Sequence, residues 1–265
     1  MSSEQISNRL EKAVRFARVA GRHTLEYFQR DNYQIETKQD ATPVTIADKS
    51  TEALLRRFIE EAFPNDAILG EELPTREGES GFRWILDPID GTKSFVHGVP
   101  LYGTLVAVEF EGKAVVGVIY IPALDECVYA MKGGGAWYVR GEGGVPQRAR
   151  VSNCATLRDA LVLTTDEKTF HETQRETSWA RLLQSAKLTR TWGDCYGYLL
   201  VATGRADCMI DPEMSVWDSA ALQPVIEEAG GVFSGWNGAR EFSTGDAIAT
   251  NPALYPEVRS HLNQN

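Results

Sequence analysis

The order of apolar and polar positions predicts a chain that starts with helices and then turns to strands. Apolar residues recur at steps of three and four through the first ~30 residues, which is typical of an amphipathic helix. The same spacing returns over 46–62, and Pro64 ends it, so a second helix is expected there. Short apolar runs at 67–69 and 84–86 predict two buried strands, and acidic residues soon follow each of them.

From residue 103 the apolar period changes to two, which is the period of a β-strand. Glu111-Gly112 between the first two such segments is a hairpin signal, so an antiparallel meander is expected. The glycine-rich stretch 141–150 is interpreted as a loop that joins two halves of the chain. The segments with strand-like alternation are 103–110, 113–120, 126–131 and 136–139.

Strand-like and helix-like segments alternate after this loop. Pro224 lies inside the last helical pattern, which predicts a kink or a late helix start because proline has no N–H. We therefore expect an α+β half over 1–148, with the antiparallel sheet, and an α/β half over 149–265. Strands are expected at 161–163, 188–192 and 208–210, and helices at 179–186, 196–203 and 222–229.

Composition narrows the class of protein. The 27 Lys and Arg against 37 Asp and Glu give a formal charge of -10, which argues against a nucleic-acid coat or a membrane-surface binder. Apolar runs stay below the ~18–20 residues of a membrane span, and the first residues lack a signal-peptide pattern. The 4 cysteines show no CxxC spacing, so we expect reduced thiols in a cytoplasmic protein.

The densest chemical signal is the segment Trp84-Ile-Leu-Asp87-Pro-Ile89-Asp90, at the end of an expected strand. Two carboxylates three positions apart can converge across a tight turn, and the Ile89 carbonyl lies between them. Oxygen ligands of this kind suit Mg²⁺ better than zinc. The alternative is an acidic, solvated turn after a strand.

Gly91 and Thr92 follow this segment directly. Glycine lets backbone amides approach a ligand closely, and Thr92 adds a hydroxyl at an expected helix start. Amides at a helix start attract anions, and phosphate above all. Metal ligands and a phosphate cradle therefore adjoin in one short stretch.

Three further acidic residues belong with this segment. Glu71 follows an expected strand, Asp218 opens an apolar helix, and Asp48 lies near a helix start. Taken singly, each is better explained as a surface charge or a helix cap. Together with Asp87 and Asp90 they form a set of carboxylates beside buried apolar sequence, where an unpaired charge is costly.

In this order Glu71, Asp87-Pro-Ile-Asp90-Gly-Thr92 and Trp217-Asp218, followed by Glu228-Ala-Gly-Gly231, resemble the inositol monophosphatase family of Mg²⁺-dependent phosphatases. The resemblance covers nearly the whole chain. It implies an α+β fold, built as a layered αβαβα sandwich, and hydrolysis of a small phosphate monoester. It also implies a homodimer.

The resemblance further implies roles for single residues. Thr92 and Asp48, together with Glu71, match the catalytic residues that orient the attacking water, and the Gly91 and Thr92 amides match the phosphate contacts. Lys38 matches a lysine near the site in many members. The implied metal ligands are Glu71, Asp87, the carbonyl of Ile89, Asp90 and Asp218.

Electrostatics supports metal-assisted attack by water. So many carboxylates would repel a phosphate dianion, whereas about two or three Mg²⁺ ions would reverse the local charge and activate water. The motifs of covalent phosphatases do not occur: no cysteine precedes an arginine by six positions, Arg22-His23 lacks the following glycine, and the spacing Asp87-x-x-Asp90 is not Asp-x-Asp.

The substrate is the finer question. Lys93 stands where inositol phosphatases commonly carry threonine, and the segment around Asp194 looks closest to the histidinol-phosphatase branch. A carboxylate beyond the phosphate would favour the ammonium and imidazole of histidinol phosphate. The resemblance places Asp194 in the substrate-contacting segment and matches Asp211 to an acidic residue that contacts inositol hydroxyls in relatives, although either could be a cap or a loop residue. The sequence thus favours L-histidinol phosphate hydrolysis in histidine biosynthesis. An inositol or nucleotide phosphatase and a non-catalytic binding protein remain alternatives.

Overall fold

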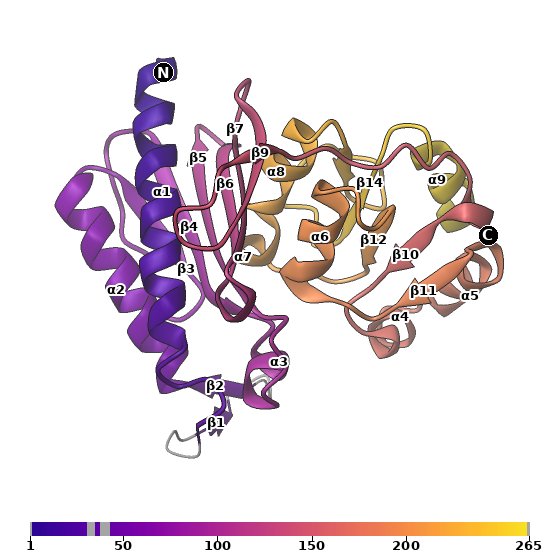
Figure 1. Cartoon of the computed structure of the whole chain (residues 1–265), viewed down its shortest axis with the longest axis horizontal. Coiled ribbons are helices and arrows are strands. Elements are labelled where there is room, and N and C mark those ends of the chain that lie inside the picture. The colour runs from indigo at the N-terminus through magenta and orange to yellow at the C-terminus, as the bar shows by residue number, and fades with distance from the viewer. Residues whose placement is uncertain (1, 31–34, 38–42, 264–265) are drawn as a thin grey trace.

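The computed structural model describes residues 2–30, 35–37 and 43–263. Helices α1 (Ser3–Thr24) and α2 (Ile46–Ala62) pack against each other and cover one face of a seven-stranded sheet (Figure 1). Ser2 and Gln5 form a capping box at the start of α1. Small buried residues, among them Ala13 and Ala17, let α1 lie close to the sheet, so the amphipathic helix is confirmed.

The seven-stranded sheet has the strand order β3-β4-β5-β6-β7-β8-β9. Only β3 and β4 are parallel, and all other neighbours are antiparallel, which confirms the expected meander. The bounds are β3 Ala67–Gly70, β4 Phe82–Asp90, β5 Gly103–Phe110, β6 Lys113–Ile121, β7 Glu126–Met131, β8 Gly135–Arg140 and β9 Gln147–Arg148. The prediction that 141–150 is entirely loop was wrong, because Gln147 and Arg148 return to pair with β8.

A second sheet has the order β11-β10-β12-β14-β13. β10 pairs in parallel with β11 and β12, whereas β14 is antiparallel to β12 and β13. β11 ends at Arg190 rather than Trp192, since its neighbour β10 ends opposite Arg190 and offers no further backbone partners. The bounds are β10 Leu161–Leu163, β11 Leu188–Arg190, β12 Cys208–Asp211, β13 Val232–Ser234 and β14 Ala247–Thr250.

The remaining helices complete five layers (Figure 1). Helices α6 (Asp194–Ala202), α7 (Val216–Ser219) and α8 (Leu222–Glu228) contact the first sheet, and α6 and α8 also contact the second sheet, so they form the middle layer. Helices α4 (Glu167–Glu172), α5 (Glu176–Ser185) and α9 (Tyr255–Asn263) pack on the far face of the second sheet. The αβαβα sandwich and the α+β class are thus confirmed.

Short elements join these layers. They are α3 Thr92–Val96, the two 3₁₀ helices Pro122–Leu124 and Leu157–Asp159, and the strand pair β1 Ile35–Thr37 and β2 Pro43–Thr45. Helix α8 begins at Leu222, so Pro224 falls in its first turn, where a missing N–H costs no helical hydrogen bond. The helix thus begins at the first residue predicted for it, and the expected late start was wrong. Helices α4 and α9 and strands β13 and β14 were not foreseen.

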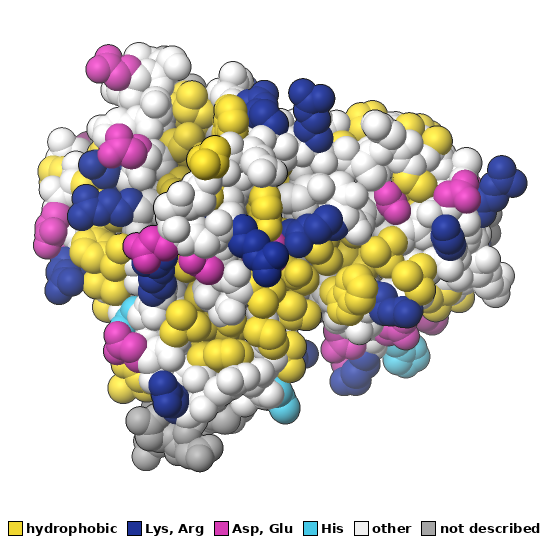
Figure 2. Space-filling view, in the orientation of Figure 1, with side chains coloured by type: hydrophobic (Ala, Val, Ile, Leu, Met, Phe, Trp, Pro, Cys, Tyr) yellow, Lys and Arg dark blue, Asp and Glu magenta, His cyan; other side chains and the backbone are white. Residues whose placement is uncertain are grey.

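The described strands of the two sheets fall on either side of residue 149, and one apolar cluster joins both halves through residues such as Ile119 and Leu199. The division at 148 into separate domains stays a prediction. Across residues 2–30, 35–37 and 43–263, every helix is too short or too polar for a bilayer crossing. On the face in Figure 2, basic side chains are interspersed with acidic and apolar ones.

Candidate active site

A bulge in β4 turns two aspartates to one side of the sheet. Residues three apart in a regular strand face opposite sides. Here Asp87 pairs with Leu105 and Asp90 with Gly103, so β4 holds one extra residue between these pairs. Pro88 fits this bulge, because it has no N–H to leave unpaired. The N–H of Ile89 then donates to Asp87 Oδ1 at 3.0 Å.

The parallel pairing of β3 and β4 brings Glu71 beside this turn. Gly70 is in register with Leu86, and the N–H of Glu71 donates to the Leu86 carbonyl at 3.2 Å. Glu71 is therefore at the same sheet edge as Asp87, although the two residues lie on different strands. The expectation that both strands deliver acidic residues to one place is met.

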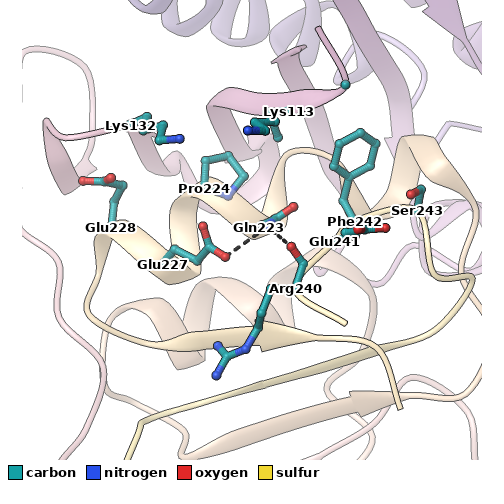
Figure 3. Close-up of a pocket in the computed structure, with 12 residues that line it drawn as sticks. Lys113, Lys132, Gln223, Pro224, Glu227, Glu228, Arg240, Glu241, Phe242 and Ser243 are labelled. Carbon is teal, nitrogen blue, oxygen red and sulfur yellow. Dashed lines mark hydrogen bonds between the residues drawn. The ribbon is translucent and has the colours of Figure 1, made fainter. Parts of the chain in front are cut away.

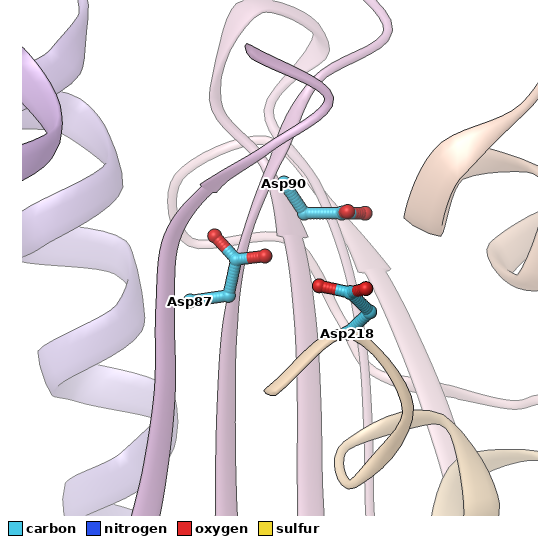
Figure 4. Close-up of side chains that lie close together, drawn as sticks. All are labelled: Asp87, Asp90 and Asp218. Carbon is cyan, nitrogen blue, oxygen red and sulfur yellow. The ribbon is translucent and has the colours of Figure 1, made fainter. Parts of the chain in front are cut away.

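Asp218 reaches the same place from the second half of the chain. It lies in the first turn of α7, where its Oδ2 accepts the N–H of Ser215 at 2.7 Å in a capping box. Carboxylate oxygens of Asp87, Asp90 and Asp218 all lie within 4.8 Å of one another. Figure 4 shows the three side chains directed toward a common point. The cap that the sequence suggested for Asp218 and its place in the cluster are thus compatible.

Burial and mutual repulsion raise the pKa of these carboxyls. Burial raises the pKa of Asp87 well above its usual range, and the charges of Glu71, Asp90, Asp218 and Asp48 add to the effect. Burial, then Asp194 and Asp218, do the same to the pKa of Asp90. The pKa of Asp218 rises to about 7, mainly through burial. A cation among these oxygens would remove this cost, so the donor set fits a hard divalent ion.

Other predicted residues surround this cluster. Asp48 is buried in the first turn of α2, near enough for its charge to act on Asp87. The Ile89 carbonyl accepts the Thr92 hydroxyl at 3.1 Å. Gly91 has a φ of 85°, and any Cβ there would lie 2.8 Å from Asp194 Oδ2, so glycine is required. Lys38 lies outside the described residues.

Helix α6 connects the cluster to the expected substrate segment. The N–H of Cys195 donates to Asp90 Oδ2 at 2.5 Å, and that of Asp194 donates to Thr165 Oγ1 at 2.9 Å. Asp194 has a left-handed φ of 52°, which is costly for a residue with a side chain. Burial and Asp211 raise the pKa of Asp194 to about 6. The Asp194 carboxyl borders the turn at Gly91 and Thr92.

The other two proposed substrate residues differ in exposure. Asp211 is 4% exposed, and its carboxylate accepts the Tyr198 hydroxyl and the Thr165 N–H, each at 2.9 Å. Tyr198 is therefore a core residue that orients Asp211. The Lys93 side chain is 75% exposed, and its Nζ lies 3.8 Å from Asp166 Oδ2. Lys93 thus reaches from α3 toward the second half.

A cavity of about 490 Å³ contains most of these groups. Sequence reasoning missed Asp166 and Glu213, which also line it. Both follow strands, β10 and β12, so the strand-end rule used for Asp87 would have found them. Other cavity residues that had not been considered are Val99, Leu101, Thr165 and Thr169.

A second cavity, of about 370 Å³, lies beside α8 and is drawn in Figure 3. Some of its polar groups already have partners. Gln223 donates to Glu227 at 3.0 Å, and Glu228 accepts the N–H groups of Gly133 and Gly135 at 2.7 Å each. The carboxylate cluster of Figure 4 lies in the larger cavity, which is therefore the candidate active site.

Known proteins resemble this chain along nearly its whole length. Histidinol-phosphatase of Chlorobaculum parvum is 42% identical over 241 residues, which is 91% of each chain. Histidinol-phosphatase of Streptomyces coelicolor is 37% identical over 245 residues, again 91% of each. The crystal structure of extragenic suppressor protein suhB from Bartonella henselae superposes with a TM-score of 0.89 at 28% identity, over 97% of this chain and 99% of that one.

The model of the inositol monophosphatase family matches residues 5–265. This range includes both sheets, the three converging aspartates and the turn at Gly91 and Thr92. The chain therefore belongs to the inositol monophosphatase family and is a phosphoric monoester hydrolase.

Proposed function

We propose that this protein hydrolyses L-histidinol phosphate to L-histidinol and phosphate, with Mg²⁺ as cofactor, in histidine biosynthesis. The observation that carries the substrate assignment is the carboxyl of Asp194, held against Gly91 at the phosphate turn. Two histidinol-phosphatases at 42% and 37% identity support the same substrate. The substrate's ammonium group would lie one short carbon chain from its phosphate, within reach of this carboxyl.

The metal ligands in this proposal are Glu71, Asp87, the Ile89 carbonyl, Asp90 and Asp218. When bound there, about two or three Mg²⁺ ions would neutralise the phosphate, activate water and stabilise the leaving oxygen. The convergence of Asp87, Asp90 and Asp218 within 4.8 Å supports this ligand set. Burial, and then the repulsion between closely placed carboxylates, raises the pKa of Asp87 and Asp90, and a bound cation would offset both effects.

The chain's own groups then orient the reactants. Thr92 and Asp48 would position the attacking water, with the Thr92 hydroxyl held by the Ile89 carbonyl at 3.1 Å. The amides of Gly91 and Thr92 would bind the phosphate oxygens. Because Asp194 stands next to this turn, a phosphate there places the remainder of the substrate toward Asp194 and Lys93.

The far wall of the cavity is acidic. Asp166 and Glu213 line it together with Asp194, while Asp211 lies behind and is oriented by Tyr198. A cationic ammonium and an imidazolium suit this wall, whereas an uncharged polyol gains little from it. A bound ammonium would also favour the ionised form of Asp194, whose pKa of about 6 reflects its burial near Asp211.

A phosphate-release assay tests this proposal. Purified protein with Mg²⁺ should act on L-histidinol phosphate with a kcat/KM at least tenfold above that on inositol 1-phosphate or adenosine 3′,5′-bisphosphate. Chelation of Mg²⁺ should abolish all three activities. Equal or reversed preference would overturn the substrate assignment but leave the family membership intact.

Asp194→Asn sharpens this test. Loss of the charge should lower kcat/KM for L-histidinol phosphate about 10- to 100-fold, because a charge-assisted bond is worth about 1.5–3 kcal/mol. Hydrolysis of inositol 1-phosphate should change little. Ser94→Ala is the matched control, since Ser94 contacts Asp194 at 3.5 Å without supplying charge. If Asp194→Asn impairs both substrates alike, Asp194 has a structural role.

The family description itself favours an alternative, an inositol phosphatase with the same metal site. A nucleotide phosphatase with the same metal site is a second alternative. A non-catalytic binding protein is further from the observations, since all the proposed metal ligands are acidic or carbonyl groups suited to the ion. We also propose a cytoplasmic homodimer, in line with the resemblance. Light scattering on the purified protein would measure its mass against 29.4 kDa per chain.

A further inference from the structure

Glu52 and Arg56 form a buried ion pair on α2, outside the residues that line the cavity. Glu52 is 0% exposed, and its Oε1 accepts Arg56 Nε at 2.7 Å, one helical turn away. Such a pair adds little net stability by itself, because the cost of desolvation offsets the attraction. Its other contacts therefore indicate its role.

Both partners bind the backbone of residues 72–74. Glu52 Oε2 accepts the N–H of Glu72 at 2.7 Å, and Oε1 accepts that of Leu73 at 3.2 Å. Arg56 donates in turn to the carbonyls of Leu73 and Pro74, each at 2.9 Å. The ion pair thus holds the segment that directly follows Glu71 by four hydrogen bonds.

The chain just before Glu71 packs against the same carboxylate. A Cβ on Gly70 would lie 2.0 Å from Glu52 Oε1, so only glycine lets the backbone pass this close. On its other side, the N–H of Glu71 is bonded to the Leu86 carbonyl of β4. The backbone of Glu71 is therefore fixed from α2 and from the sheet together.

Helix α2 connects this arrangement to the site. Asp48, Glu52 and Arg56 recur at steps of four, so they lie on one face of α2. Asp48 lies near enough to the carboxylate cluster for its charge to act on Asp87, and Glu52 and Arg56 hold the backbone that follows Glu71. One helix face thus serves both the cluster and its support.

We propose that Glu52 and Arg56 are positioning residues that hold Glu71 in place for divalent-cation binding. This inference rests on the proposed function, in which Glu71 is a metal ligand. A ligand whose backbone is already ordered loses less conformational entropy when the ion binds. Outer groups that orient metal ligands typically contribute about 10- to 100-fold to metal affinity.

Glu52→Gln tests the proposal, because the glutamine NH₂ must face either Arg56 Nε or a backbone N–H and so breaks a bond. Arg56→Lys is a milder second variant that keeps the charge but loses the fork to Leu73 and Pro74. Mg²⁺ binding to the folded, metal-free protein is measured by calorimetry, with circular dichroism to confirm folding. We expect about 10- to 100-fold weaker binding in Glu52→Gln and a smaller loss in Arg56→Lys.

Asp66→Asn is the matched control. Asp66 is also a buried carboxylate, and it accepts bonds from Arg9 and Trp84 at 2.8 and 2.9 Å, but its side chain does not bind the segment after Glu71. The variant Asp66→Asn should lower the melting temperature without changing the Mg²⁺ affinity. This outcome would separate an effect on the position of Glu71 from a general loss of stability. Wild-type affinity in folded Glu52→Gln and Arg56→Lys would overturn the inference.

Glu71→Gln separates this inference from the proposed function. If Glu71→Gln weakens Mg²⁺ binding while Glu52→Gln and Arg56→Lys do not, only the positioning role fails. If Glu71→Gln itself binds Mg²⁺ like the wild type, the ligand assignment fails, and the positioning role fails with it. Parallel weakening in Glu71→Gln and Glu52→Gln is the expected result.

Discussion

At the scale of single residues, the site depends on a few irregular backbone positions. Pro88 sits in the bulge that turns Asp87 and Asp90 to one side, and Gly91 allows the turn beside Asp194. Asp194 itself has a left-handed φ of 52°. The left-handed backbone of Asp194 costs free energy and persists because the surrounding structure holds it. Backbone strain of this kind is typical of an active site.

Asp90→Asn should remove activity and leave the fold intact. The variant keeps an oxygen for the Cys195 N–H but deletes one charge from the cluster. We expect kcat/KM to fall at least about 100-fold, which corresponds to about 3 kcal/mol of lost transition-state stabilisation. Phosphate release at saturating Mg²⁺ measures it. Asp159→Asn, whose side chain is 66% exposed, is the control, and retained turnover in Asp90→Asn would contradict the ligand assignment.

At the scale of elements, the middle helical layer decides how the two halves meet. Helix α8 packs on β6 where Gly117 leaves room for the Ala221 carbonyl and Pro224. Ala221 follows α7 closely, so this contact also sets where Asp218 lies. Close approach of helix and strand thus positions one corner of the carboxylate cluster.

Gly117→Ala should destabilise the protein. The new Cβ would lie 2.1 Å from the Ala221 carbonyl oxygen and 2.8 Å from Pro224, and a backbone neighbour can yield only by shifting the helix. We expect the free energy of unfolding to fall by about 1–3 kcal/mol in urea denaturation, as for other overpacked cores. Val145→Ala, at a position 81% exposed, should change it by less than about 0.5 kcal/mol. Equal stability of both variants would rule out this tight contact.

At the scale of the whole molecule, carboxylates from both halves gather in one cavity. Asp87 and Asp90 come from the first sheet, and Asp218 comes from the helical layer between the sheets. In the metal-free protein, the folded state holds protons on these groups that the unfolded chain releases. Stability should therefore depend on pH and on Mg²⁺ together.

The metal-free protein should lose stability as pH rises. The pKa of Asp218 is about 7 when folded, against an ordinary value of 3.8, so between these values the folded state binds more protons than the unfolded state. The contribution of Asp218 to the free energy of unfolding then falls between about pH 4 and pH 7, by about 1.4 kcal/mol per pKa unit. Melting temperatures measured across pH with and without Mg²⁺ test this.

Saturating Mg²⁺ should flatten that slope, since the ion stabilises the ionised carboxylates. Asp218→Asn should reduce the slope in the metal-free protein, because it removes one of the titrating groups. A melting temperature that rises with pH over the same range in metal-free wild type would contradict the raised pKa of Asp218.

Local sequence predicted most helices and strands, and it singled out the segment 84–92 as the central part of the candidate site. The meander, α1 and α2 follow from periodicity, and the segment 84–92 reveals its chemistry because its groups are adjacent in the chain. Helix α9 and strands β13 and β14 went unseen. Their short segments carry too little periodic signal and form through contacts with distant elements.

The sequence by itself determined which oxygen-bearing side chains this protein has and that Asp87 and Asp90 adjoin a glycine turn. Only the tertiary structure decided that Asp218 meets them, that Asp166 and Glu213 border the same cavity, and that Glu52 supports the chain next to Glu71. The physical reason is the distance along the chain over which each interaction acts. Local propensity acts over a few residues, whereas these groups meet through sheet register and helix packing between segments far apart in the chain.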